Sequence, residues 1–219
     1  MELETMTALA PPSSRTSRGS RNQRDQEPVD ERYRALKAML EALPGHGPNG
    51  PRVLLLASPD SPVECAGDGI ARAFAAVGER TMLVNCSDDG FGVEGQVNGS
   101  HKIGEDVLAW LVAGEDASLC PALSSPLRGL IRLPLSDRGD LFRTSPLSRL
   151  FAWARSDMDR VIVVASPLAR SADALLLARQ TDAVVLGVRM GQTTRGSVRQ
   201  ARQDLLKAGG RIGGAICLD

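Results

Sequence analysis

The sequence predicts an α/β protein with a single doubly wound, mostly parallel sheet flanked by helices. Three observations lead to this fold class. Short apolar runs without alternation, such as Val53-Leu54-Leu55-Leu56-Ala57 and Val161-Ile162-Val163-Val164-Ala165, are typical of strands covered on both faces. Segments with helical periodicity alternate with these runs, as in successive strand–helix–strand units. At 219 residues, the chain is long enough to bury one such core.

The first half of the chain begins with polar sequence. Residues 1–28 are rich in Ser, Pro, Arg and Gln and have no apolar periodicity, which predicts a disordered tail before a single domain over residues 29–219. Apolar residues at spacings of three and four predict a first helix over 29–43, followed by a Pro/Gly-rich break. The elements expected next are a strand over 53–57, a helix over 62–77 that ends at Gly78, a strand over 81–84 and a helix over 105–113.

The second half repeats the alternation. Runs of Val, Ile and Leu predict strands over 130–133, 161–165, 183–188 and 212–217. Segments with helical periodicity between them predict helices over 145–155, 172–179 and 194–208. The last of these helices and its approaches are basic, which fits either a solvated face or a face that docks an acidic segment of a partner.

Composition excludes several classes of protein. The 26 basic and 26 acidic side chains balance, and aromatic residues make up only 3% of the chain, so neither a nucleic acid nor an anionic membrane is indicated as partner. The four cysteines form no CxxC pair and there are two histidines, which argues against a zinc site or a disulfide framework. No segment reaches the ~20 apolar residues of a membrane span, and the N-terminus lacks a signal-peptide pattern. We therefore expect a cytoplasmic protein.

Several stretches carry a family resemblance through their order and spacing. They are Glu31-x-x-Arg34-x-x-Lys37, Gly104-Glu105-Asp106-Val107-Leu108-Ala109, Ala113-Gly114-Glu115, Asp159-Arg160-Val161-Ile162-Val163, and residues 171–193. From about residue 31 to the C-terminus, the sequence resembles the cytoplasmic domain of bacterial tyrosine autokinases (BY-kinases) and chain-length regulators of capsular and exopolysaccharide synthesis. This family belongs to the MinD/ParA-like branch of P-loop proteins, so the resemblance implies a P-loop NTPase-like fold. The first stretch resembles the ExxRxxR element through which those kinases pack into rings.

The loop after the first expected strand departs from the family pattern. In the family this loop reads PGEGKST, and it presents backbone N–H groups and a lysine to the phosphates of the nucleotide. Here it reads Pro59-Asp60-Ser61-Pro62-Val63-Glu64-Cys65. Asp60 and Pro62 stand at the glycine positions, Val63 at the lysine and Glu64 at the magnesium-binding serine. Because proline has no N–H to donate and the lysine is absent, we expect a degenerate nucleotide site without a cofactor.

The same residues match a helix N-terminal signature. Ser61-Pro62-Val63-Glu64 has Ser at the expected N-cap, Pro at the first helical position and Glu three residues after the cap. The hypothesis is a capping box in which Ser61 accepts from the N–H of Glu64 and Glu64 bonds back to the N–H of Ser61. The glutamate would then complement the helix dipole where the nucleotide's phosphates would otherwise lie.

The acidic positions of the family are also lost. The family's LLIDAD motif corresponds to residues 83–87, with Asn85 and Ser87 in place of aspartates, and the Walker-B aspartate falls at Val164. Mg²⁺ requires hard oxygen ligands, which a valine does not offer. The family's C-terminal tyrosine cluster has no counterpart, since Tyr33 is the only tyrosine. No catalytic residue and no metal site is expected.

These observations predict a pseudokinase: a non-catalytic component of capsule, exopolysaccharide or adhesive polysaccharide biosynthesis and export. Its expected partner is the cytoplasmic part of an inner-membrane polysaccharide co-polymerase, which would hold the protein at the membrane. Glu31, Arg34 and Lys37 form the expected interface. A homo-oligomer is a further possible assembly.

Two other functions stay open from sequence. An unorthodox tyrosine kinase or ATPase of the same pathway would use ATP and Mg²⁺, and would recruit Asp88 or Asp89 for the metal. A MinD/ParA-like positioning factor would use the same fold to bind a cellular surface.

Overall fold

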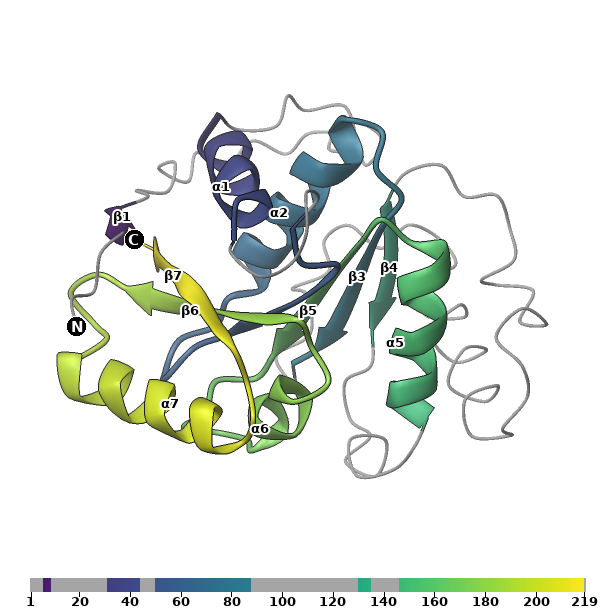
Figure 1. Ribbon diagram of the computed structural model, residues 1–219. Helices are drawn as coiled ribbons and strands as arrows, with labels where there is room; N and C mark the ends of the chain where they lie inside the picture. The colour runs from purple at the N-terminus through teal and green to yellow at the C-terminus, as the bar shows by residue number, and fades with distance from the viewer. Residues whose placement is uncertain (1–5, 9–30, 44–49, 88–129, 135–145, 219) are drawn as a thin grey trace.

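The structure is a computed structural model that describes residues 6–8, 31–43, 50–87, 130–134 and 146–218. Seven strands form one sheet in the order β1-β7-β6-β2-β5-β3-β4, and every neighbouring pair is parallel (Figure 1). The strands are β1 (Met6–Ala8), β2 (Val53–Ala57), β3 (Thr81–Cys86), β4 (Leu130–Pro134), β5 (Arg160–Ala165), β6 (Ala183–Arg189) and β7 (Ile212–Leu218). The predicted fold class is confirmed, with a sheet that is wholly parallel in the described residues.

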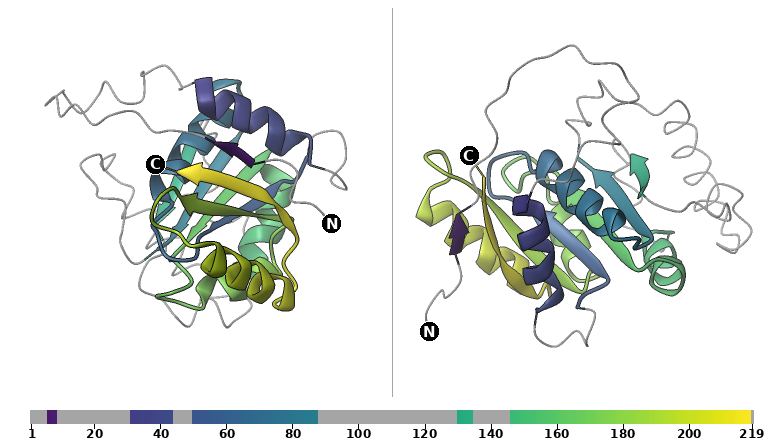
Figure 2. Two further views of the ribbon diagram at one scale, coloured as in Figure 1. Left: turned by 90° about the vertical axis from the view of Figure 1, so that its left-hand side faces the viewer. Right: turned by 90° about the horizontal axis from the view of Figure 1, so that it is seen from above.

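The helices lie on both faces of the sheet. Figures 1 and 2 show α1 and α2 on one side and α6 and α7 on the other. Described helices are α1 (Glu31–Glu41), α2 (Glu64–Ala76), α5 (Pro146–Asp157), α6 (Asp173–Ala178) and α7 (Arg195–Lys207). Each matches a helix expected from periodicity, with ends that differ by one or two residues. The helix expected over 105–113 lies outside the described residues.

Two apolar cores follow from the alternation of side chains along each strand. In β2, Leu54 and Leu56 pack under α1 and α2, whereas Val53 and Leu55 pack under α5, α6 and α7. All four side chains are fully buried. This two-sided burial explains why the strand is apolar at every position, which made it recognisable in the sequence.

The N-terminal segment differs in part from the prediction. Met6–Ala8 forms the short strand β1, which pairs in parallel with Ala215–Cys217 at the edge of β7. The rest of residues 1–28 lies outside the described residues, and the prediction of a disordered tail stays a prediction there. Within the described part of the chain, no helix combines the length and the apolar composition needed to cross a bilayer.

Candidate functional site

The candidate site is the loop between β2 and α2, residues 58–63. It lies at the carboxyl end of β2, between β5 and β6 in the sheet. The strand order reverses at β2. Strands β3 and β5 lie on one side of β2, and the chain then continues to β6, which pairs with the opposite edge of β2. Doubly wound proteins bind ligands at such a switch point. The residues of this loop therefore decide whether a nucleotide can bind.

Loop residues 58–60 are tied to two neighbouring loops. The carbonyl oxygens of Ser58 and Pro59 accept hydrogen bonds from the backbone N–H groups of Leu168 and Ala169, each at 2.9 Å. The Asp60 carboxylate accepts a hydrogen bond of 2.7 Å from the hydroxyl of Thr193, in the loop after β6. A carboxylate thus occupies a position in the turn where the sequence resemblance places a glycine.

Val63, where the sequence resemblance places the lysine, is part of the apolar core. It is 1% exposed and belongs to the cluster under α1 and α2. Its Cγ1 lies so close to Gly187 of β6 that a Cβ on that glycine would be 2.3 Å away. Real Cβ atoms do not approach a neighbour so closely, so a larger residue at 187 would displace Val63. The buried Val63 side chain therefore offers no hydrogen-bond donor to a phosphate at this position.

The predicted capping box is wrong. Helix α2 begins at Glu64, the N-cap position is Val63, and no side chain caps the helix. The hydroxyl of Ser61 instead donates to the Asp60 carboxylate at 3.1 Å, and its carbonyl accepts from the hydroxyl of Ser58. The physical reason is that Asp60, anchored by its bond to Thr193, engages Ser61 before the helix starts.

Glu64 lies in the first turn of α2 and is buried, with 7% of its surface exposed. Its Oε1 is inaccessible to solvent and has no hydrogen-bond partner among the described residues. The expected charge complement to the helix N-terminus is present, because a carboxylate lies in that turn. The bond back to Ser61 is not formed. Pro62 is half-buried and Cys65 is exposed.

Asn85 and Ser87, at the positions where the resemblance places the motif aspartates, bond to each other. The Asn85 side-chain oxygen accepts from the backbone N–H of Ser87 at 3.0 Å and from its hydroxyl at 2.8 Å. Asn85 is 1% exposed and Ser87 is fully buried. The two polar groups satisfy each other in a local turn at the end of β3. No carboxylate is supplied from these positions.

Val164 of β5, where the resemblance places the Walker-B aspartate, packs against the first part of α2. It is fully buried, and a Cβ on Gly67 of α2 would lie 2.3 Å from its Cγ2. Helix α2 therefore approaches β5 through a glycine, with the valine methyl in the gap. Among the described residues, no group of three His, Cys, Asp or Glu side chains could hold a metal ion. Asp88 and Asp89 lie outside the described residues.

The three expected interface residues of α1 are not equivalent. Glu31 and Arg34 are exposed, with side chains 82% and 58% accessible, and form an ion pair of 3.1 Å. Lys37 is only 14% accessible, and its Nζ lies 2.6 Å from Glu41 and 3.4 Å from Glu79. Glu31 and Arg34 are thus available to a partner, whereas Lys37 contributes to binding α1 within the domain.

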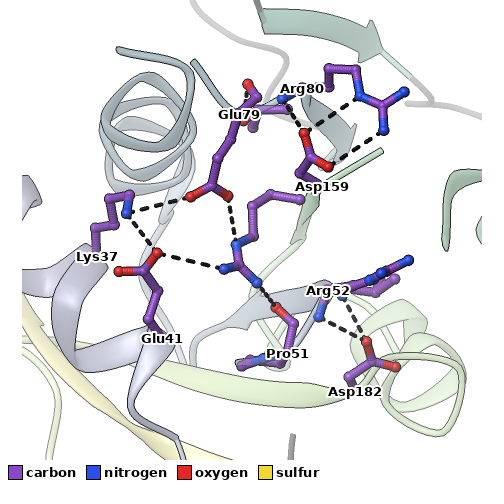
Figure 3. A network of polar contacts seen from close by, with 11 residues as sticks. Lys37, Glu41, Pro51, Arg52, Glu79, Arg80, Asp159 and Asp182 are labelled. Atoms are coloured by element: carbon purple, nitrogen blue, oxygen red, sulfur yellow. Dashed lines mark hydrogen bonds and ion pairs between the residues drawn. The ribbon is translucent and has the colours of Figure 1, made fainter. Parts of the chain in front are cut away.

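Lys37 belongs to a charged cluster that the sequence analysis missed, formed with Glu41, Glu79 and Arg160 (Figure 3). The Arg160 side chain is 3% exposed; its Nε lies 2.9 Å from Glu79, and one terminal nitrogen lies 3.6 Å from Glu41. The other terminal nitrogen donates to a backbone carbonyl at 2.8 Å, and the guanidinium lies 4.9 Å from the Phe74 ring. This cluster connects α1 to the starts of β3 and β5. The sequence offered one indication of this cluster, which is the arginine at the start of an otherwise apolar strand. A buried arginine requires acidic partners nearby.

A second carboxylate, Asp182, fastens the starts of the central strands. It accepts from the backbone N–H groups of Arg52 and Val53 at 3.0 and 2.9 Å, and from the Arg155 guanidinium at 2.8 Å. Burial alone would raise its pKa, but the bonds from Val53 and Arg155 outweigh this and hold the pKa below the ordinary value of 3.8. The role of this group is structural, since it lies at the end of the sheet opposite the loop.

No family model and no curated protein matches this sequence. Solved structures do match its fold. The chimerical protein CapA2B2 superposes with a TM-score of 0.66 at 15% identity, over 90% of this chain and 87% of that one. The kinase domain of the Escherichia coli tyrosine kinase ETK gives 0.62 at 20% identity, over 94% and 82%. The kinase domain of VpsO gives 0.63 at 19% identity, over 86% and 94%. This chain therefore shares its fold with these solved proteins, two of which are kinase domains, as the sequence resemblance predicts.

Proposed function

We propose that this protein is a non-catalytic, BY-kinase-like component of bacterial capsule, exopolysaccharide or adhesive polysaccharide biosynthesis and export. It acts by binding the cytoplasmic part of an inner-membrane polysaccharide co-polymerase. The observation that carries this proposal is the filled phosphate loop: Val63 is buried against Gly187, and Glu64 is buried in the first turn of α2. The fold is kept while the groups that hold a nucleotide are replaced.

The charge at the helix N-terminus opposes a nucleotide. A helix N-terminus attracts anions through its free N–H groups and dipole, and this attraction holds the phosphates in P-loop proteins. Here a buried carboxylate, Glu64, already lies in the first turn. Two like charges 4 Å apart repel by about 4 kcal/mol at an effective dielectric constant of 20. A phosphate near Glu64 would meet this repulsion without a lysine to offset it.

The outward face of α1 supports an interaction role. Glu31 and Arg34 begin this face, and the exposed residues that continue it at helical spacing are Ala35, Ala38 and Ala42. Small side chains let a partner helix approach closely, and the two charged residues can determine which partner is accepted. The opposite face of α1 is fastened to the domain by buried Leu36 and Leu40.

The experiment that tests this proposal compares two surface variants in a host that depends on the protein for polymer production. The Glu31→Ala/Arg34→Ala variant should lower both polymer output and co-purification of the co-polymerase, because it removes the charged end of the exposed face. The control is Gln203→Ala, an exposed neutral residue on α7, on the other side of the sheet. If the double variant produces polymer and retains its partner as the control does, this interface is wrong.

A catalytic role lacks a supporting observation in the described residues. An unorthodox kinase or ATPase would need a cation to replace the lysine, yet Val63 fills that place and Asp60 and Glu64 add negative charge beside it. No observation specifically favours a positioning factor. The binding role is therefore the function that the geometry supports best.

A further inference from the structure

Helix α7 carries a stripe of arginines on its exposed side. Arg195, Arg199 and Arg202 are exposed, and they follow each other at spacings of four and three, so they lie on one side of the helix. Leu206, four residues further on, continues the same side and is 41% exposed. We call these four residues the α7 stripe. It extends for about 17 Å along the helix.

The positive charge of the stripe is not neutralised locally. None of its three arginines has an acidic side chain within ion-pair distance among the described residues. The only acid of α7, Asp204, lies on another side of the helix, near Lys207 at 4.0 Å. Residues 189–211 carry six arginines and lysines against one aspartate, which leaves 20 basic and 25 acidic side chains elsewhere. The balanced net charge of the chain therefore hides a strongly basic face.

The shape and chemistry of the stripe fit a surface that bears phosphates. Ala201 and Leu205 bury the inner side of α7 against the sheet, so its outer side is convex. A convex face suits a flat partner better than an extended peptide, which usually lies in a groove with side-chain pockets. Arginine binds phosphate oxygens in a bidentate fork, which suits phosphate groups better than isolated point charges. The exposed Leu206 adds an apolar contact at the level of the headgroups.

We propose that the α7 stripe binds anionic phospholipid headgroups and holds the protein directly on the membrane surface. This inference goes beyond the proposed function and does not depend on it, because it requires no co-polymerase. The two surfaces can be used together, since α1 and α7 lie on opposite sides of the sheet (Figure 2). Glu31 and Arg34 then face away from the bilayer, where the cytoplasmic part of a partner can reach them.

The test measures binding of the purified full chain to vesicles by co-sedimentation. Vesicles of phosphatidylcholine alone are compared with vesicles that also contain phosphatidylglycerol. We expect binding only to the anionic vesicles, with loss at high salt because surface charges are screened. Each arginine near an anionic surface strengthens binding by about fivefold, so the Arg195→Gln/Arg199→Gln/Arg202→Gln variant should bind about 100-fold more weakly.

Two controls keep the result specific. An Arg15→Gln/Arg18→Gln/Arg21→Gln variant removes the same charge from the N-terminal segment and should retain most of the binding. Leu206→Ser should weaken vesicle binding severalfold without a change in charge. Undiminished binding by the α7 variant would overturn the proposal. Equally tight binding of the wild type to duplex DNA or polyglutamate would also overturn it, because the stripe would then be a general polyanion site.

Discussion

Replacing Arg160 by methionine should destabilise the fold strongly, because it removes the central cation of the buried charged cluster. The side chain is 3% exposed; it pairs with Glu79 at 2.9 Å and Glu41 at 3.6 Å, and stacks over the Phe74 ring at 4.9 Å. Removing one partner of a buried pair typically costs 3–5 kcal/mol. Because Glu79 and Glu41 are 22% and 32% exposed and can be partly rehydrated, we expect about 3 kcal/mol.

The assay is thermal and urea unfolding of the purified full chain. For a domain of this size, about 3 kcal/mol corresponds to a fall in Tm of roughly 6–12 °C. The matched control is Arg80→Met, which breaks the exposed Arg80–Asp159 pair, with side chains 53% and 46% accessible. Exposed pairs contribute at most about 1 kcal/mol. If Arg160→Met lowers the free energy of unfolding no more than Arg80→Met does, the cluster does not fasten α1 as inferred.

Three further predictions concern packing, pH and thiol reactivity. Gly67→Ala should destabilise the protein by about 1–3 kcal/mol, because its Cβ would lie 2.3 Å from Val164. Gly196→Ala in α7 should be neutral or stabilising in the same unfolding assay, because its Cβ would make only an ordinary contact of 3.7 Å with Thr194 Oγ1. Because the folded pKa of Asp182 is lowered, the stability it contributes is present above its unfolded pKa near 3.8 and is lost as pH falls through the folded pKa. Unfolding measured as a function of pH should therefore show a steeper loss below about pH 4 in wild type than in Asp182→Asn; equal slopes would refute this role. Burial, and then the charge of Asp173, raise the pKa of the Cys86 thiol, so alkylation of the native protein at mildly alkaline pH should label exposed Cys65 and spare Cys86, as peptide mapping can show.

The sheet could be predicted because its strands are buried on both faces. β2 is apolar at every position and β5 at every position after Arg160, and all residues of both strands are buried. The start of α2 was predicted wrongly because the local Ser-Pro-x-Glu pattern favours a cap at Ser61. The contact that overrides it comes from Thr193, which lies 133 residues from Asp60 in the sequence. A pattern of four neighbouring residues carries no information about a hydrogen bond to a residue so distant in the sequence.

The sequence predicted which nucleotide-binding residues are missing, but it did not predict how the residues in their place pack. Residues 59–65 contain no lysine, and residues 83–87 contain no aspartate or glutamate. That Val63 would pack on Gly187 depends on how closely α2 approaches β6, and periodicity does not encode that distance. The charged cluster joins Lys37, Glu79 and Arg160 from three distant parts of the chain, so only the arginine at the start of β5 hinted at it.

The inference that the loop no longer holds a nucleotide is tested most directly by titration calorimetry of the full chain with ATP and with ADP, each with Mg²⁺. We predict no binding at millimolar nucleotide, with circular dichroism showing a folded protein, because buried Val63 stands where the resemblance places the lysine and the buried Glu64 carboxylate lies in the first turn of α2. Binding at micromolar nucleotide would contradict this inference and would reopen a catalytic role.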